Sequence, residues 1–109
     1  MKLDSVGDIV AIRELSLKGE SGVSESVQIL IGKPGPFPDS TGYYGPFQIV
    51  GLGPVEIHYA AGIDAIQALQ LVMPMIGITL RFLNHKVGEG LRWEGGEESD
   101  FGFPETSNS

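Results

Sequence analysis

The feature that most constrains this chain is a run of sixteen residues without a charge, which lies between Asp64 and Arg81. The less apolar positions of this region recur at spacings of three and four, which predicts one stripe along a helix. These positions are Gln67, Gln70, Pro74, Gly77 and Arg81. We therefore expect a helix from Asp64 to about Leu83, kinked at its proline, because proline lacks a backbone donor and crowds the preceding turn.

A strand is the alternative for the second half of this region. From Ile76 to Phe82 an apolar side chain stands at every second position, and such alternation is typical of a half-buried strand. The sequence favours the helix and leaves the strand open.

A helix of this composition needs cover around most of its girth. About twenty helical residues span ~30 Å, whereas strands of six or seven residues reach only ~20–23 Å. One small sheet therefore cannot shield it. The cover could be the proline-rich segment 33–46, the tail with Phe101 and Phe103, or a second copy of the chain. In a homodimer we expect the helix to contribute Leu69, Val72 and Met73.

The strands are expected before the helix. Residues 9–18 and the alternating residues 26–31 predict a hairpin, with a bulge near Arg13–Glu14 where the apolar parity shifts. Further strands are expected over 47–50 and 55–59, and a short one over 91–93. Strands joined by short turns are antiparallel. The predicted fold class is α+β: an antiparallel meander of about four strands, one long helix and a short C-terminal strand.

The segment 33–46 concentrates prolines and aromatic rings. Four of the seven prolines fall here, and proline disfavours a regular central strand, so we expect a long loop. Its rings Phe37, Tyr43 and Tyr44 either pin the loop to the domain or form a recognition surface. Pinning is the simpler interpretation.

Length and charge limit the classes of function. The 109 residues suit one domain, expected over 1–104 with a disordered tail over 105–109. The net charge is −7, and five acids with no base follow Trp93. Without a basic stripe we expect no nucleic-acid partner. The N-terminus lacks a signal peptide's apolar run and the uncharged stretch is short for a membrane span, so we expect a cytoplasmic protein with no membrane partner.

No group of residues predicts catalysis or a cofactor. There is no cysteine, and His58 and His85 are the two histidines. Glu56 and His58 would share one strand face, but a metal site needs three or four converging ligands. The Gly51-Leu52-Gly53 turn lacks the following helix of a phosphate site. We therefore expect no catalytic, cofactor-binding or metal residues.

The order of several short motifs resembles a family of short bacterial proteins classed as a domain of unknown function. The motifs are Phe47-Gln48-Ile49-Val50-Gly51-Leu52-Gly53, Asp64-Ala65-Ile66-Gln67-Ala68-Leu69-Gln70-Leu71, Ile76-Gly77, Leu91 with Trp93, and Gly102-Phe103-Pro104. The resemblance extends over roughly residues 10–104 and implies a compact α+β domain of bacterial origin. It brings no functional residues.

Two functions are compatible with these observations. The leading hypothesis is a non-enzymatic protein-interaction or binding domain, with a homodimer or an unidentified protein as partner. The alternative is a small-molecule-binding domain or minor enzyme, with a pocket between the 33–46 loop and the strand face of Glu56 and His58.

Overall fold

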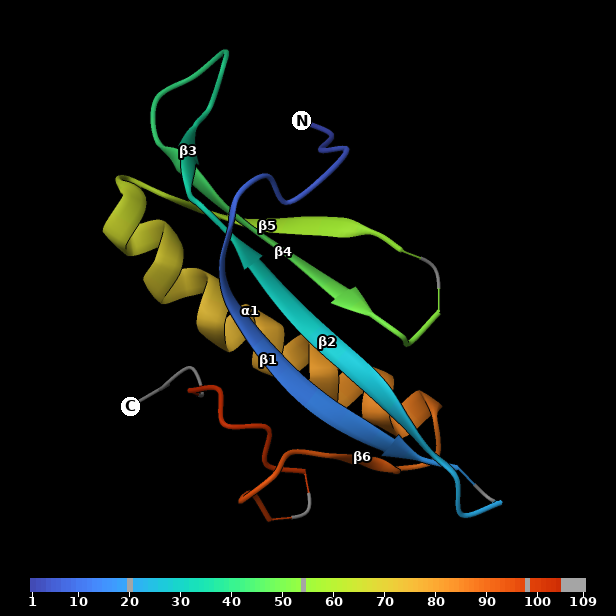
Figure 1. Ribbon diagram of the computed structural model, residues 1–109. Helices are drawn as coiled ribbons and strands as arrows, with labels where there is room; N and C mark the ends of the chain where they lie inside the picture. The colour runs from blue at the N-terminus through green and yellow to red at the C-terminus, as the bar shows by residue number, and fades with distance from the viewer. Residues whose placement is uncertain (20, 54, 98, 105–109) are drawn as a thin grey trace.

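The computed structural model describes residues 1–19, 21–53, 55–97 and 99–104 (Figure 1). It is an α+β fold in which a helix packs along one face of an antiparallel sheet, as the sequence predicts. The elements are β1 (Ile9–Lys18), β2 (Ser24–Gly32), β3 (Gly35–Pro36), β4 (Tyr43–Val50), β5 (Ile57–Gly62), α1 (Ala65–Lys86) and β6 (Leu91–Arg92). Among the described residues the sheet has six strands. The short β6 is the expected C-terminal strand, and the two-residue β3 is the addition to the expected meander of about four strands. The predicted tail over 105–109 lies outside the described residues.

The long strands follow the chain as a meander. Neighbours across the sheet run β6–β1–β2–β4–β5, and β3 continues beyond β2 along the same side of β4. The β1–β2 hairpin pairs Leu15 with Val27. Its register shift lies between Ile9 and Ala11, so the expected bulge near Arg13 is wrong. The apolar parity changes there because Arg13 takes a place on the helix-facing side, while Ile12 points to the other face and is exposed.

Strand β4 begins inside the segment that the prolines marked as a loop. It extends from Tyr43 and contains Pro46, with strands on both sides. The pairing of β4 with β2 ends at the pair Phe47–Ile31, and the pairing of β4 with β3 begins at Tyr44. Pro46 falls in the gap between these two ladders, so its missing donor interrupts no regular pairing there. The expectation of a loop up to Pro46 is therefore wrong.

The helix α1 begins with a side-chain cap and continues through its proline. Asp64 is the N-cap and accepts a hydrogen bond from Gln67 N at 2.8 Å, and Gln67 Oε1 accepts from Ile63 N at 2.7 Å. This resembles a capping box. Pro74 lies inside the helix, which runs on to Lys86. The helical prediction for the second half is confirmed and the strand alternative is wrong.

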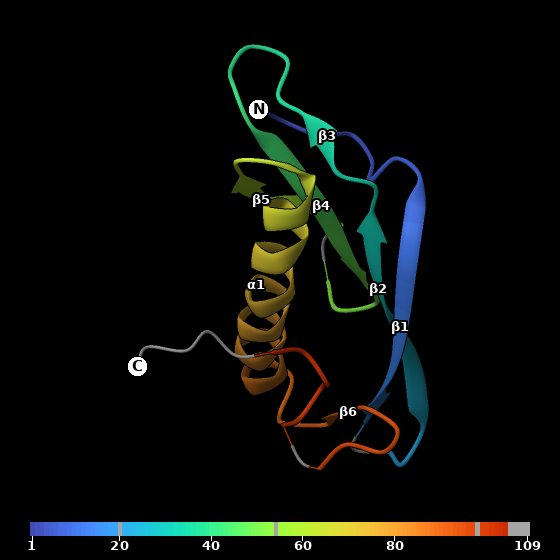
Figure 2. The same cartoon turned by 90° about the vertical axis from the view of Figure 1, so that its left-hand side faces the viewer.

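The helix approaches the sheet closely at its first turns because the facing residues are small. A Cβ added to Gly62 would meet the backbone of Ala68, and one added to Gly45 would lie 3.0 Å from the Ala68 carbonyl oxygen. Further along, the buried helical side chains of Val72, Ile76 and Leu80 complete the core. Figure 2 shows the helix and sheet as two layers.

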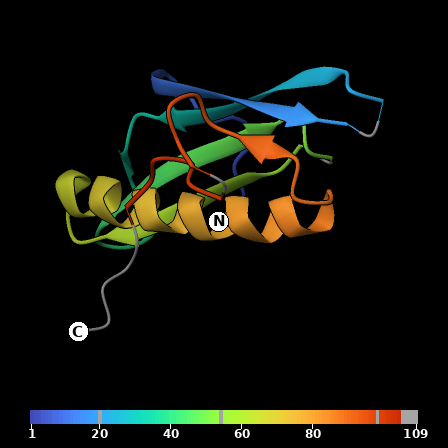
Figure 3. The same cartoon turned by 90° about the horizontal axis from the view of Figure 1, so that it is seen from below.

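The C-terminal segment covers the flank of the core on the β1 side (Figures 2 and 3). Phe101 is 3% exposed and belongs to the core, and Phe103 lies against Gly77 of the helix. The Arg13 guanidinium carbon stands 4.3 Å from the Trp93 ring centroid and 4.8 Å from that of Phe103, and Nη1 donates to the Phe101 carbonyl. The tail therefore supplies part of the helix cover from within the chain.

By length and composition α1 is also able to cross a membrane. The uncharged run covers only residues 65–80, whereas the helix is 22 residues long. In this fold its inner side is part of the core, and core helices meet the same length criterion.

Candidate functional site

One face of α1 carries a row of large apolar side chains that the rest of the described chain leaves in solvent. They are Leu71, Met75, Ile78 and Phe82, with exposed fractions of 45%, 38%, 55% and 62%. Their spacings of four, three and four residues place them on one face of the helix. We call these four residues the apolar row. Contiguous apolar surface of this kind marks interaction sites.

Strand β5 lies beside the apolar row and is an edge of the sheet. Among the described residues β5 pairs with β4 and with no other strand. Between the strand and the row is a shallow hollow of about 390 Å³, lined by Ala60, Ala61, Leu71, Pro74, Met75, Ile78 and Thr79. An apolar depression therefore adjoins a strand edge that has no partner in the described chain.

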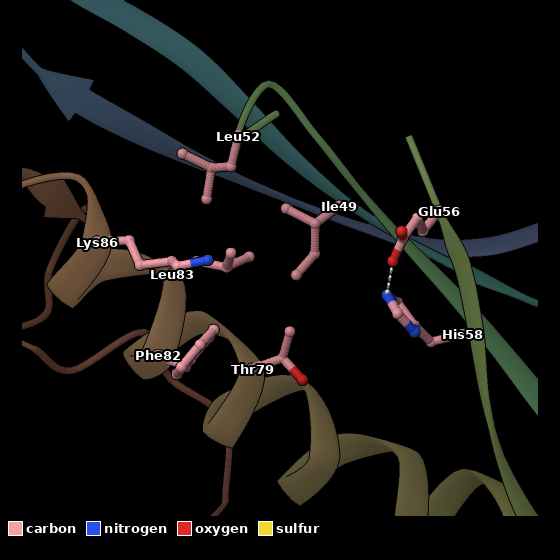
Figure 4. A pocket seen from close by; sticks show the side chains of 8 residues that line it. All are labelled: Ile49, Leu52, Glu56, His58, Thr79, Phe82, Leu83 and Lys86. Carbon is pink, nitrogen blue, oxygen red and sulfur yellow. Dashed lines mark ion pairs between the residues drawn. The ribbon is translucent and has the colours of Figure 1, made fainter. Parts of the chain in front are cut away.

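A second hollow of about 390 Å³ continues along the helix past Thr79, which lines both (Figure 4). Its lining residues are Ile49, Leu52, Glu56, His58, Thr79, Phe82, Leu83 and Lys86. Figure 4 shows aliphatic and aromatic side chains around its middle, with the Glu56–His58 pair on the strand side and Lys86 reaching in from the helix side. We call the two hollows together the α1–β5 groove.

The polar groups of the groove are paired with neighbours. Glu56 Oε2 lies 3.6 Å from His58 Nε2, and the His58 ring lies 5.4 Å from that of Phe47. Lys86 Nζ stands 5.1 Å from the Phe82 ring centroid. The Thr79 hydroxyl donates to the Met75 carbonyl oxygen at 2.8 Å. Because the Glu56 and His58 side chains are 68% and 46% exposed, water screens this ion pair.

No group of three or more histidine, aspartate or glutamate side chains placed to hold a metal occurs in the part of the chain that the structure describes. The groove offers apolar area, a strand edge and a few polar groups at one end. That combination suits recognition of a polypeptide segment.

The position of Glu56 and His58 differs from the sequence-based prediction in two respects. His58 lies opposite Phe47 in the β4–β5 ladder, on the face of the sheet that the helix covers. Ala60 is the next β5 side chain on that face, and Tyr59 points to the other face. The hollow beside Glu56 and His58 is closed by α1 and not by the 33–46 segment. The predicted pocket between these two parts is therefore wrong.

The three aromatic rings of the 33–46 segment, Phe37, Tyr43 and Tyr44, are half-buried. Phe37 and Tyr44 have ring centroids 5.7 Å apart, and each also packs against Tyr59, at 5.8 and 6.3 Å. Tyr43 faces Gly62 across the β4–β5 ladder. Ring packing of this kind holds the 33–46 segment onto the sheet, as the pinning interpretation predicts.

The helical residues predicted for the homodimer lie mostly inward. Val72 is fully buried, and Leu69 and Met73 are half-buried against the core. The prediction rested on the apolar girth of the helix, which does not indicate the side that the sheet covers. Gly77, one of the less apolar positions, is itself buried beside Phe103. The apolar row has helical spacing in the sequence. Which apolar side of the helix stays exposed depends on where the sheet and the C-terminal segment pack, and the sequence alone does not give that.

Comparison with known proteins identifies the family but no function. No curated protein and no solved structure matches the chain. A family model described as "Domain of unknown function (DUF6968)" matches residues 11–105. Since the match extends over most of the chain and the fold is α+β as the resemblance implied, this chain belongs to the DUF6968 family of domains of unknown function.

Proposed function

We propose that this chain is a non-enzymatic protein-interaction domain that binds its partner in the α1–β5 groove. The observation that carries the proposal is the position of the apolar row beside an edge strand that is unpaired in the described chain. A polypeptide strand added to β5 would gain backbone hydrogen bonds and would place alternate side chains on the row.

The energetics favour covering this surface. Apolar area removed from water contributes roughly 25 cal/mol per Å², and four large side chains at one site supply such area. Glu56 and His58 lie on the strand side of the second hollow, and Lys86 lies across it on the helix side. This is the usual division between an apolar centre and a polar rim in protein interfaces.

The test compares two isoleucines with equal exposure. Ile78 in the groove and Ile12 on β1 are each 55% exposed, so Ile78→Lys and Ile12→Lys make the same chemical change at similar cost to the fold. The probes are the chain itself at rising concentration and a display library of random extended peptides. We expect saturable binding that Ile78→Lys weakens at least about tenfold, an effect of ~1.4 kcal/mol, and that Ile12→Lys leaves unchanged.

Two results would reject the groove as the binding surface. One is the absence of binding to either probe. The other is binding that survives both Ile78→Lys and Phe82→Lys. As part of the same proposal, we predict that the protein is cytoplasmic and of bacterial origin and that it binds neither nucleic acid nor membranes.

A small molecule in the second hollow is the other candidate function. Its support is the apolar floor beneath a rim with Glu56, His58 and Lys86, in a volume of about 390 Å³; ligand pockets usually measure ~300–1,000 Å³. A compound that raises the melting temperature of the native chain but not of His58→Ala would support this function. Equal shifts in both proteins would place the compound elsewhere.

A further inference from the structure

We propose that the occupant of the α1–β5 groove is a second copy of this chain, joined by antiparallel pairing of β5 with β5 across a two-fold axis. The inference rests on the proposed function and names its partner. One such interface would pair the open edge of β5 and would also bury the apolar row.

The first argument is charge. The chain carries a net charge of −7, so two copies repel one another unless their contact surfaces are neutral. Strand β5 contains no Asp, Glu, Lys or Arg, and α1 carries none from Ala65 to Leu80. The acids Glu94, Glu97 and Asp100 belong to the segment that packs on the β1 flank. Two copies that meet at β5 therefore keep these acids away from the contact, and the acid and base that line the groove, Glu56 and Lys86, balance each other in charge.

The second argument is geometry. The six residues of β5 extend ~20 Å, and the row from Leu71 to Phe82 extends ~17 Å along the helix. Because the two lengths are similar, β5 of a second copy can pair along β5 while the apolar row of that copy lies along this one. A two-fold axis perpendicular to the sheet pairs β5 with its copy and keeps both helices on the same face. Each apolar row then faces the other across the axis, as an isologous interface requires.

The third argument is the absence of protection along β5 itself. Edge strands of monomers usually carry a lysine, a proline or a bulge that prevents pairing with other chains. The β4–β5 register from Tyr43–Gly62 to Gln48–Ile57 is continuous, and the strand IHYAAG contains neither lysine nor proline. This edge is therefore suited to pairing.

Disulfide trapping tests the pairing directly, because the chain has no cysteine of its own. If both helices lie on the same face of the joined sheet, the two-fold axis passes through a residue position of β5. The registers with the most pairs centre this axis on Tyr59 or Ala60. Opposite Cα atoms then lie ~4.5–5.5 Å apart, within the range of a disulfide. We expect mild oxidation to produce a covalent dimer from Tyr59→Cys alone, or from Tyr59→Cys mixed with Ala61→Cys. The control Ser26→Cys, which is exposed on β2, should remain monomeric.

Light scattering supplies the second readout and separates this inference from the proposed function. We expect twice the monomer mass for the native chain and for Ile12→Lys, and the monomer mass for Tyr59→Lys. The two new lysines would lie directly opposite each other in the Tyr59-centred register and diagonally across the pair in the Ala60-centred one, where like charges destabilise a strand pair. A native monomer at micromolar concentrations, or a dimer unaffected by Tyr59→Lys, overturns the β5 dimer. If that monomer binds an extended peptide and Ile78→Lys weakens the binding at least about tenfold, the second copy is rejected and the interaction domain is retained.

Discussion

The two long edges of the sheet are built in different ways. Strand β1 carries Arg13, Glu14 and Lys18, has a register shift near its start, and pairs with β6 at its end. Strand β5 is continuous, and His58 is its one titratable side chain besides Tyr59. Charges, irregular pairing and a covering segment are the devices that keep an edge from pairing further.

The same contrast applies to the two flanks of the helix. On the β1 side the chain returns after β6 and places Phe101 and Phe103 over the core and Gly77. On the β5 side the row from Leu71 to Phe82 has no such cover among the described residues. This chain therefore covers one side of its fold with its own C-terminal segment, and we propose that a partner covers the other side.

The largest effect is expected at Phe101, which secures the covered side. Its ring is 3% exposed and contributes to the core, and Phe→Ala at a buried site costs ~3–5 kcal/mol. We expect Phe101→Ala to lower the free energy of unfolding in urea by that amount. Phe82→Ala, at a 62% exposed ring of the open side, is the matched control and should lower it by less than ~1 kcal/mol when measured on the monomer. Equal losses would remove the difference between the flanks.

The next largest loss of stability is expected at Gly62, where the helix packs closely on β5. In Gly62→Ala the new methyl group would meet the Ala68 backbone, and overpacking of this kind costs ~1–3 kcal/mol. Gly19→Ala is the control, because its methyl group would make only a 3.5 Å contact with the Val23 carbonyl oxygen. Chemical denaturation of both variants measures the difference. A Gly62→Ala protein as stable as native would show that the helix does not need to lie so near β5.

A smaller effect is expected at Arg13, whose guanidinium stands between two rings and donates to the Phe101 carbonyl. Cation–π contacts and one hydrogen bond contribute roughly 1–2 kcal/mol together. We expect Arg13→Met to lose about that much stability and to shift the Trp93 fluorescence to longer wavelength. Arg13→Lys should recover only part of it, because the planar stacking is lost. Unchanged Trp93 emission in Arg13→Met would contradict the role of this residue in holding the tail.

The sequence allowed the local features of this fold to be predicted and missed those that depend on distant segments. The helix follows from Asp64, the 3.6-residue period and the uncharged run, all within one stretch of chain. The place of Pro46 inside β4 depends on the gap between β2 and β3, which is a property of the assembled sheet.

The candidate site was less predictable for the same reason. Val72 and the apolar row are equally apolar in the sequence, and packing of the sheet and the C-terminal segment decided which of them became core. The unpaired edge of β5 could not be recognised before the strand order was known.

Amide hydrogen exchange of β5 tests the central claim, that this edge is paired in the native assembly, most directly. In the native chain at high concentration we expect the β5 amides to exchange slowly, and in Ile78→Lys to exchange at least about tenfold faster, the ratio that corresponds to ~1.4 kcal/mol. The β1 amides should be unchanged between the two proteins, because β1 lies at the opposite edge of the sheet from the groove. Exchange in β5 that is the same in both proteins and at every concentration would contradict the account.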